Sequence, residues 1–140
     1  MRRAHTLPEL VLTLALLSLC TAIAVPTVVR TSAQWALRAA SSDVVNALVL
    51  AREAALARGT TAVVVIDAPR GELTVLCAGD TIARRAVSAL HHVTLAASGD
   101  SVRYAPDGVA TGVSNTTVLI ARGGLVDSVV VSRLGRVRWE

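Results

Sequence analysis

An uncharged, apolar run at residues 10–29 constrains the fold of this chain more than any other feature. The run lies between Glu9 and Arg30 and consists mainly of Leu, Val, Ile and Ala. As a helix rising 1.5 Å per residue it would be about 30 Å long, which is the hydrocarbon thickness of a bilayer. Its few Ser and Thr hydroxyls can bond to the helix's own carbonyls, so they do not prevent insertion. We therefore expect a helix that crosses a membrane.

The flanks of the run predict its orientation. Arg2 and Arg3 precede it, and positive charge favours the cytoplasmic side, so the rest of the chain should lie outside the cytoplasm. A cleaved secretory signal is an alternative, because Ala-Ile-Ala at residues 22–24 would pass as a cleavage site. The apolar stretch of such a signal, however, spans only about 7–15 residues. An ordinary signal anchor fits the length but gives no reason for Glu9.

Glu9 lies at the edge of the predicted membrane span. A carboxylate there is costly unless it is paired, so we interpret it as a functional residue. A structural alternative remains open. The positive end of the helix dipole would stabilise the Glu9 carboxylate, and Pro8 would be a first-turn proline.

The N-terminus resembles the class III signal of type IV pilins and type II secretion pseudopilins. The resemblance rests on a short basic leader, a small residue, Thr-Leu-Pro-Glu-Leu at residues 6–10, and the apolar run. It implies that a prepilin peptidase cuts between Ala4 and His5 and then methylates the new amino group of His5. It also implies that Glu9 is the assembly glutamate at the fifth mature position. Pro26 would match the family's helix-kinking proline.

The rest of the chain should form one head domain attached to this anchor. Residues 31–58 change to an amphipathic helical pattern that Gly59 can end, so we predict one helix over residues 7–58. The expected parts are a leader (1–4), a transmembrane and assembly helix (5–30), its amphipathic continuation (31–58) and a β-rich periplasmic head (59–140). The apolar stripe of the continuation comprises Leu37, Ala40, Val44, Leu48, Ala51 and Ala55.

Short β-branched segments separated by turn residues follow Gly59. Because no βαβ alternation occurs, the sheet should be mainly antiparallel, with the helix covering one face, in a pilin-like α+β fold. The chain has no Phe and only three aromatic residues, so its core should consist of Val, Leu, Ile and Ala. The expected strands are residues 61–66, 72–77, 81–87, 92–95, 102–104, 116–121, 126–132 and 136–140.

Two segments of the head sharpen the resemblance. Residues 104–112 are Tyr-Ala-Pro-Asp-Gly-Val-Ala-Thr-Gly, and residues 135–138 are Gly-Arg-Val-Arg. Both are similar to the GspH/FimT subfamily, which unites the H-type minor pseudopilin of type II secretion with FimT-like minor pilins. This implies a single-pass inner-membrane protein that assembles into a periplasm-spanning filament. Its implied partners are the prepilin peptidase, other pseudopilins or pilins, and the inner-membrane assembly platform.

Two functions follow from this resemblance. The first is a minor pseudopilin, a structural subunit of a type II secretion pseudopilus. The alternative is a FimT-like minor pilin that binds DNA for uptake or supports pilus assembly. Arg136 and Arg138, joined by Arg133, are the candidate nucleic-acid contacts, because side chains two apart in a strand share a face. Val137 and Trp139 should then face the helix.

An ordinary origin for these arginines remains open. The chain has 14 Arg and no Lys, which suggests a composition bias rather than selection for phosphate binding.

Residues suited to catalysis are not grouped in this sequence. His91 and His92 are adjacent, so in a strand they would point to opposite faces. Cys20 falls in the predicted span and Cys77 in the head, so neither a disulfide nor a metal spacing is expected. Gly123-Gly124 indicates a hairpin turn rather than a phosphate-binding loop. We predict a structural protein without catalytic residues, metal or cofactor.

Overall fold

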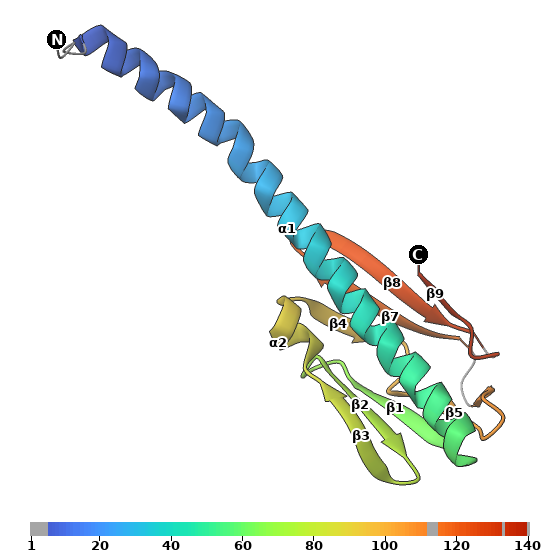
Figure 1. The fold of residues 1–140 in the computed structure, drawn as a ribbon. Coiled ribbons are helices and arrows are strands. Elements are labelled where there is room, and N and C mark those ends of the chain that lie inside the picture. Colours follow the sequence, from blue (N-terminus) through green and yellow to red (C-terminus); the bar gives the residue numbers. More distant parts are fainter. Residues whose placement is uncertain (1–5, 112–114, 133, 140) are drawn as a thin grey trace. The chain divides into compact units, whose positions relative to one another are not determined.

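The computed structural model describes residues 6–111, 115–132 and 134–139. These residues form a long helix, a short helix and nine strands (Figure 1). The long helix α1 spans Leu7–Arg58, which confirms both predicted ends. The chain separates into two compact units, Met1–Ser32 and Ala33–Glu140, and each contains part of α1.

In the first unit, α1 keeps its hydroxyls satisfied without help from other elements. All its described side chains, residues 6–32, are exposed. The Ser and Thr hydroxyls donate to carbonyls three or four residues earlier, as predicted for a helix that can enter lipid. Examples are Thr13 to Leu10 (2.9 Å), Ser18 to Ala15 (2.8 Å) and Thr27 to Ile23 (3.1 Å).

In the second unit, α1 packs through a face made mostly of alanine. These side chains belong to the same buried core as the inward residues of the strands. Gly59 (φ +59°) ends the helix, and the Thr60 amide donates to the Ala55 carbonyl at 3.2 Å, the 6→1 bond of a Schellman cap. The buried residues confirm the predicted stripe and extend it: Ala33, Leu37, Ala40, Ser41, Val44, Ala47, Leu48, Ala51 and Ala55.

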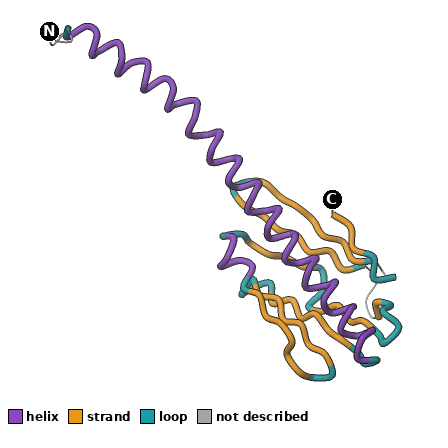
Figure 2. The backbone as a smooth tube through the Cα atoms, viewed as in Figure 1, coloured by secondary structure: helices purple, strands orange, loops and turns teal. Residues whose placement is uncertain are grey.

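The strands form two antiparallel sheets instead of the one we predicted (Figure 2). The orders are β3-β2-β1-β5-β6 and β4-β7-β8-β9. The chain leaves the first sheet after β3, enters the second at β4, and returns for β5 and β6; alternation alone does not specify such a path. The elements are β1 (Ala62–Asp67), β2 (Glu72–Cys77), β3 (Asp80–Arg85), α2 (Val87–His91), β4 (Thr94–Ala97), β5 (Ser101–Tyr104), β6 (Ala110–Thr111), β7 (Thr116–Arg122), β8 (Leu125–Val131) and β9 (Val137–Trp139).

Both sheets turn one face toward a shared core with α1. Buried residues alternate along β1 and β2 and pair across the strands, as in Val64 with Val75. The same holds for Val118 and Val129 in the second sheet. The core is built from Val, Leu, Ile and Ala as predicted, and Tyr104 is its largest fully buried side chain.

The short helix α2 was not predicted, and it corrects two expected strands. Residues 81–87 form a strand only as far as β3 reaches, and His92 takes a left-handed conformation (φ 52°) that ends α2 before β4. Tertiary contacts hold α2 in place. The Ser88 amide donates to the Gly71 carbonyl at 3.0 Å, and a Cβ on Gly71 would collide with the Ser88 side chain. No local sequence pattern predicts such a contact.

Candidate assembly and nucleic-acid surfaces

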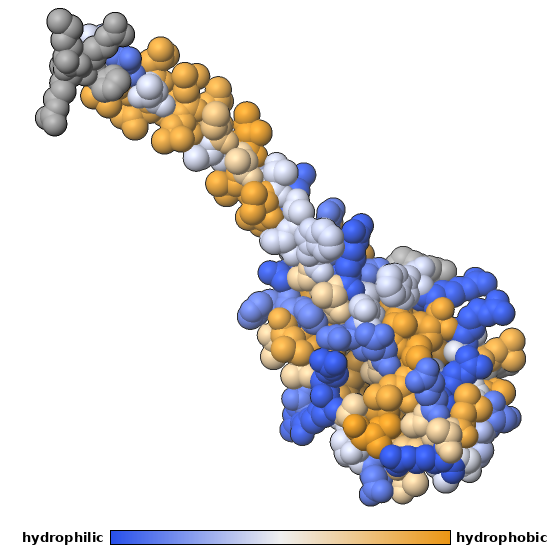
Figure 3. Space-filling model, in the orientation of Figure 1, coloured by the Kyte–Doolittle hydropathy of each residue, from blue (hydrophilic) through white to orange (hydrophobic). Residues whose placement is uncertain are grey.

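The first part of α1 is an apolar surface with one acidic residue at its start. Figure 3 shows this segment as mostly hydrophobic side chains. Among the described residues, α1 is the one helix whose length and composition would allow it to cross a membrane. The Thr6 carbonyl accepts the amides of Glu9 (3.0 Å) and Leu10 (3.2 Å), which places the Glu9 carboxylate in the first turn.

The two other predicted features of the anchor have different outcomes. Pro26 lies inside α1, and the helix continues through it from Leu7 to Arg58. Ala4 and His5, the predicted cleavage and methylation site, lie outside the described residues, so this processing stays a prediction.

The predicted arginine motif follows a turn that Ser132 and Gly135 stabilise. The Gly135 amide donates to the Ser132 carbonyl at 2.8 Å, and the Ser132 amide donates to the Arg136 carbonyl at 2.9 Å. The Arg136 amide also donates to the Ser132 hydroxyl at 3.2 Å. Gly135 has φ +71°, a conformation that costs other residues free energy. The turn thereby starts β9 at a defined position.

Gly135 also brings the two family-like motifs together. A Cβ at this position would lie 3.1 Å from a ring carbon of Tyr104 and 3.2 Å from the carbonyl oxygen of Gly108. The segments 104–112 and 135–138 therefore touch, although more than 20 residues separate them in the sequence. Sequence inspection found both motifs but did not predict their contact.

Arg136 and Arg138 are both exposed, and both line one shallow hollow of about 340 Å³. Arg138 pairs with Val130 of β8 in the ladder. Among the described residues, neither arginine has an ion-pair partner. Arg133, the third candidate, lies outside the described residues. The other residues lining the hollow are Asn115, Val130, Ser132 and Leu134.

The alternation predicted for β9 holds, although one of its two inward residues stays exposed. Val137 and Trp139 pair with the buried Val131 and Val129, so both lie on the inner side of the sheet, opposite Arg138. Val137 packs against the core, whereas Trp139 remains 58% exposed. Trp139 therefore lies on the predicted side of the strand without being buried there. Its exposure follows from its place on a three-residue edge strand, where no further strand among the described residues flanks it.

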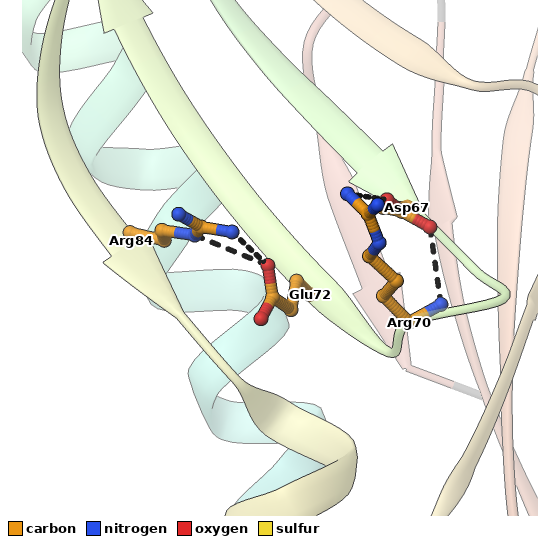
Figure 4. A network of polar contacts seen from close by, with 4 residues as sticks. All are labelled: Asp67, Arg70, Glu72 and Arg84. Carbon is orange, nitrogen blue, oxygen red and sulfur yellow. Dashed lines mark hydrogen bonds and ion pairs between the residues drawn. The ribbon is translucent and has the colours of Figure 1, made fainter.

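Two other exposed arginines, Arg70 in the β1–β2 turn and Arg84 on β3, are engaged by carboxylates (Figure 4). Arg84 donates to Glu72 through Nε at 3.1 Å, and this hydrogen bond raises the pKa of the Arg84 guanidinium above its usual range. Arg70 forms an exposed ion pair with Asp67 at 3.6 Å, and its amide donates to the same carboxylate at 3.0 Å. These side chains differ from Arg136 and Arg138, which are exposed and have no ion-pair partner among the described residues.

Two buried or half-buried polar links were missed by sequence inspection. His91 Nε2 lies 2.9 Å from Asp43 Oδ2, joining α2 to α1, so the histidine pair is not in a strand as expected. Ser41 donates to Asp127, joining α1 to β8. Within the described part of the chain, no three His, Cys, Asp or Glu side chains are placed to hold a metal ion. Sequence spacing carries no signal for contacts between elements this far apart.

These features define a class of protein: a pilin-like α+β chain in which a long N-terminal helix carries an antiparallel head. Two crystal structures of the type IV minor pilin FimU from Pseudomonas aeruginosa (strain PAO1) share this fold. One has a TM-score of 0.63 and 16% identity, covering 74% of this chain and 87% of that chain. The other has a TM-score of 0.61 and 15% identity, covering 74% and 92%.

The sequence of the head identifies the family to which the chain belongs. The family model of the type II transport protein GspH matches residues 40–135, well over half of the chain. The chain therefore belongs to the GspH family, as its motifs predicted. No curated protein matched its sequence. Membership makes it a pilin or pseudopilin subunit, a structural protein that assembles with others of its kind.

Proposed function

We propose that this protein is a minor pseudopilin of a type II secretion system, anchored in the inner membrane with its head in the periplasm. The observation that carries the proposal is the combination of a GspH head with an exposed apolar helix whose first turn contains a glutamate. A prepilin peptidase would cut between Ala4 and His5 and methylate the new amine. The subunit would then join the pseudopilus that moves folded proteins outward.

The apolar helix explains why such a subunit must assemble. Its side chains are exposed in the monomer, so outside lipid they need the helices of neighbouring subunits. Glu9 would leave the membrane edge by pairing with the amino group of an adjacent subunit, which is largely charged at neutral pH. That pairing would set the axial position of one helix against the next.

Replacing Glu9 tests this account. Glu9→Leu should insert and be processed normally, since it lowers the cost of the span, while incorporation into filaments should fall at least about tenfold. Glu9→Gln keeps the size of the side chain and should show the same loss. The measurement is the amount of protein in sheared filaments, with intact-mass analysis of the membrane-extracted protein to identify the mature N-terminus.

Glu53 supplies the matched control, because it is an exposed glutamate on the same helix outside the apolar run. Glu53→Gln should assemble at the wild-type level. Wild-type incorporation of Glu9→Leu would show that the pairing account is wrong. A retained Met1, or cleavage after Ala24, would remove the proposed processing.

DNA binding is a second candidate function, and two exposed arginines favour it: Arg136, just before β9, and Arg138 within it. Arg136 and Arg138 line one hollow just after a fixed turn and have no carboxylate partner among the described residues. Guanidinium groups so placed can contact phosphate oxygens in a planar, two-donor geometry. A subunit with this property would bind DNA without reading its sequence.

Salt titration of the full chain in detergent tests this candidate. Each phosphate contact adds a slope of about −0.9 to log affinity against log salt on duplex DNA. The double variant Arg136→Gln, Arg138→Gln should therefore flatten the slope by about 2 units. Arg70→Gln, Arg84→Gln removes the same charge from arginines already bound to carboxylates and should flatten it less. Equal binding by the two variants, or none by the wild type, removes this candidate.

A further inference from the structure

Trp35 is a large aromatic side chain that the core does not use. It is 65% exposed, whereas Ala33 and Leu37, two residues to either side, are 8% and 5% exposed. Two residues correspond to about 200° around a helix, so Trp35 projects from the face opposite the core. Trp35 is therefore free of the core and available for a contact outside the head.

Arg38 accompanies Trp35 on this face. Its guanidinium carbon lies 5.9 Å from the centre of the indole ring, a cation–π distance, and Arg38 itself is exposed. The side chain of Arg38 thus reaches back along the helix toward the residue three positions earlier. Helical side chains lean toward the N-terminus of their helix, which here is the direction of the apolar run.

The position of Trp35 along α1 fits the outer edge of a bilayer. It follows the last residue of the apolar run, Val29, by six residues, or about 9 Å of helix. The polar headgroup layer adds about 5–8 Å to each side of the hydrocarbon core. Because the indole leans back by part of a turn, the ring falls within that layer. Tryptophan is enriched at this depth, where its ring is half apolar and its N–H can donate.

We propose that Trp35 and Arg38 form an interfacial anchor that binds the headgroup of an anionic phospholipid at the outer surface of the membrane. The indole lies among the headgroups and upper acyl chains, and the Arg38 guanidinium donates to the lipid phosphate while covering the ring. The anchor holds the membrane-bound subunit at a fixed depth before assembly. This inference rests on the membrane span of the proposed function.

Tryptophan fluorescence of the full chain in liposomes tests the proposal. Trp139→Phe leaves Trp35 as the single tryptophan, since the chain has two. In vesicles of phosphatidylcholine with phosphatidylglycerol, lipids brominated near the headgroup end of the acyl chain should quench Trp35 at least about twice as strongly as lipids brominated near its methyl end. Adding Arg38→Gln should raise quenching by aqueous acrylamide about twofold, and the rise should be smaller in phosphatidylcholine alone.

A second probe separates failure of the anchor from failure of the span. Leu16→Trp, placed in a chain with Trp35→Phe and Trp139→Phe, reports on the apolar run itself and should be quenched most by the deeply brominated lipid. If this probe is deep but Trp35 is quenched as in water, the anchor is overturned and the span stands. If both probes are aqueous, the proposed membrane span is overturned as well. Unchanged quenching on Arg38→Gln, or an equal rise in both vesicle types, overturns the assignment of an anionic lipid to Arg38.

Discussion

Tyr104 shows how one residue links the motif of the head to its stability. It is almost fully buried in β5, and its ring supports Gly135 at the turn before β9. Burial disfavours the phenolate and so raises the pKa of the Tyr104 hydroxyl above its ordinary value of about 10. In the unfolded chain the hydroxyl ionises at that ordinary value, so alkaline pH should favour unfolding through this residue.

The pH dependence follows from that difference. The neutral hydroxyl contributes its full stability below pH 10, and the contribution is lost as the pH rises from 10 toward the raised pKa of the folded state. At pH 11 the loss should reach at most about 1.4 kcal/mol, the value of one pKa unit. Denaturant unfolding at pH 8 and pH 11 measures it. Tyr104→Phe should lose less stability than the wild type over this interval.

A spectroscopic readout accompanies that comparison, because Tyr104 is the only tyrosine. Its ionisation in the folded protein can be followed by phenolate absorbance without interference from other tyrosines. A folded-state titration midpoint at or below 10, or an equal loss of stability in Tyr104→Phe, would contradict the prediction.

The C-terminal strand β9 shows how far the placement of single residues could be predicted. Alternation placed Arg138 opposite Val137 and Trp139, and the ladder with β8 confirms it. The exposure of Trp139 could not be predicted, because it depends on the sheet ending at β9. The contact of Gly135 with Tyr104 could not be predicted either, since it joins a turn to a strand that is close only in the tertiary fold.

At the scale of elements, the long helix was the most predictable part. Its apolar run, its alanine-rich stripe and its terminal Gly59 all act within a few residues of one another, and both ends agree with the structure. The hairpin of β7 and β8 was predicted for the same reason, since Gly123 and Gly124 both take positive φ in its turn.

Elements that depend on distant partners were predicted less well. The helix α2 has five residues, too few to show a helical period, and it is held by Gly71 and Asp43. The two-residue strand β6 exists through its pairing with β5. The division into two sheets also depends on distant partners. Alternation predicts which face a strand buries but not which neighbour it pairs with.

At the scale of the whole molecule, the two compact units predict that the head is a self-sufficient domain. Every buried hydrophobic residue among those described lies between Ala33 and Val131, within the second unit. The first unit contributes none, and its exposed apolar side chains would lower solubility outside lipid or a filament. A chain that starts at Ala33 should therefore be soluble without detergent and should keep the head's full core.

Removing the first buried residues of α1 tests whether the head domain begins at Ala33. A chain that starts at Ser42 lacks the buried Ala33, Leu37, Ala40 and Ser41, and it leaves Asp127 without the Ser41 hydroxyl. Deleting one buried leucine side chain costs about 2–5 kcal/mol, so the shorter chain should unfold at a much lower urea concentration than the chain from Ala33. Circular dichroism during urea titration measures both. Equal midpoints would mean that α1 before Ser42 adds nothing to the head, and aggregation of the chain from Ala33 would mean that the head needs its anchor to fold.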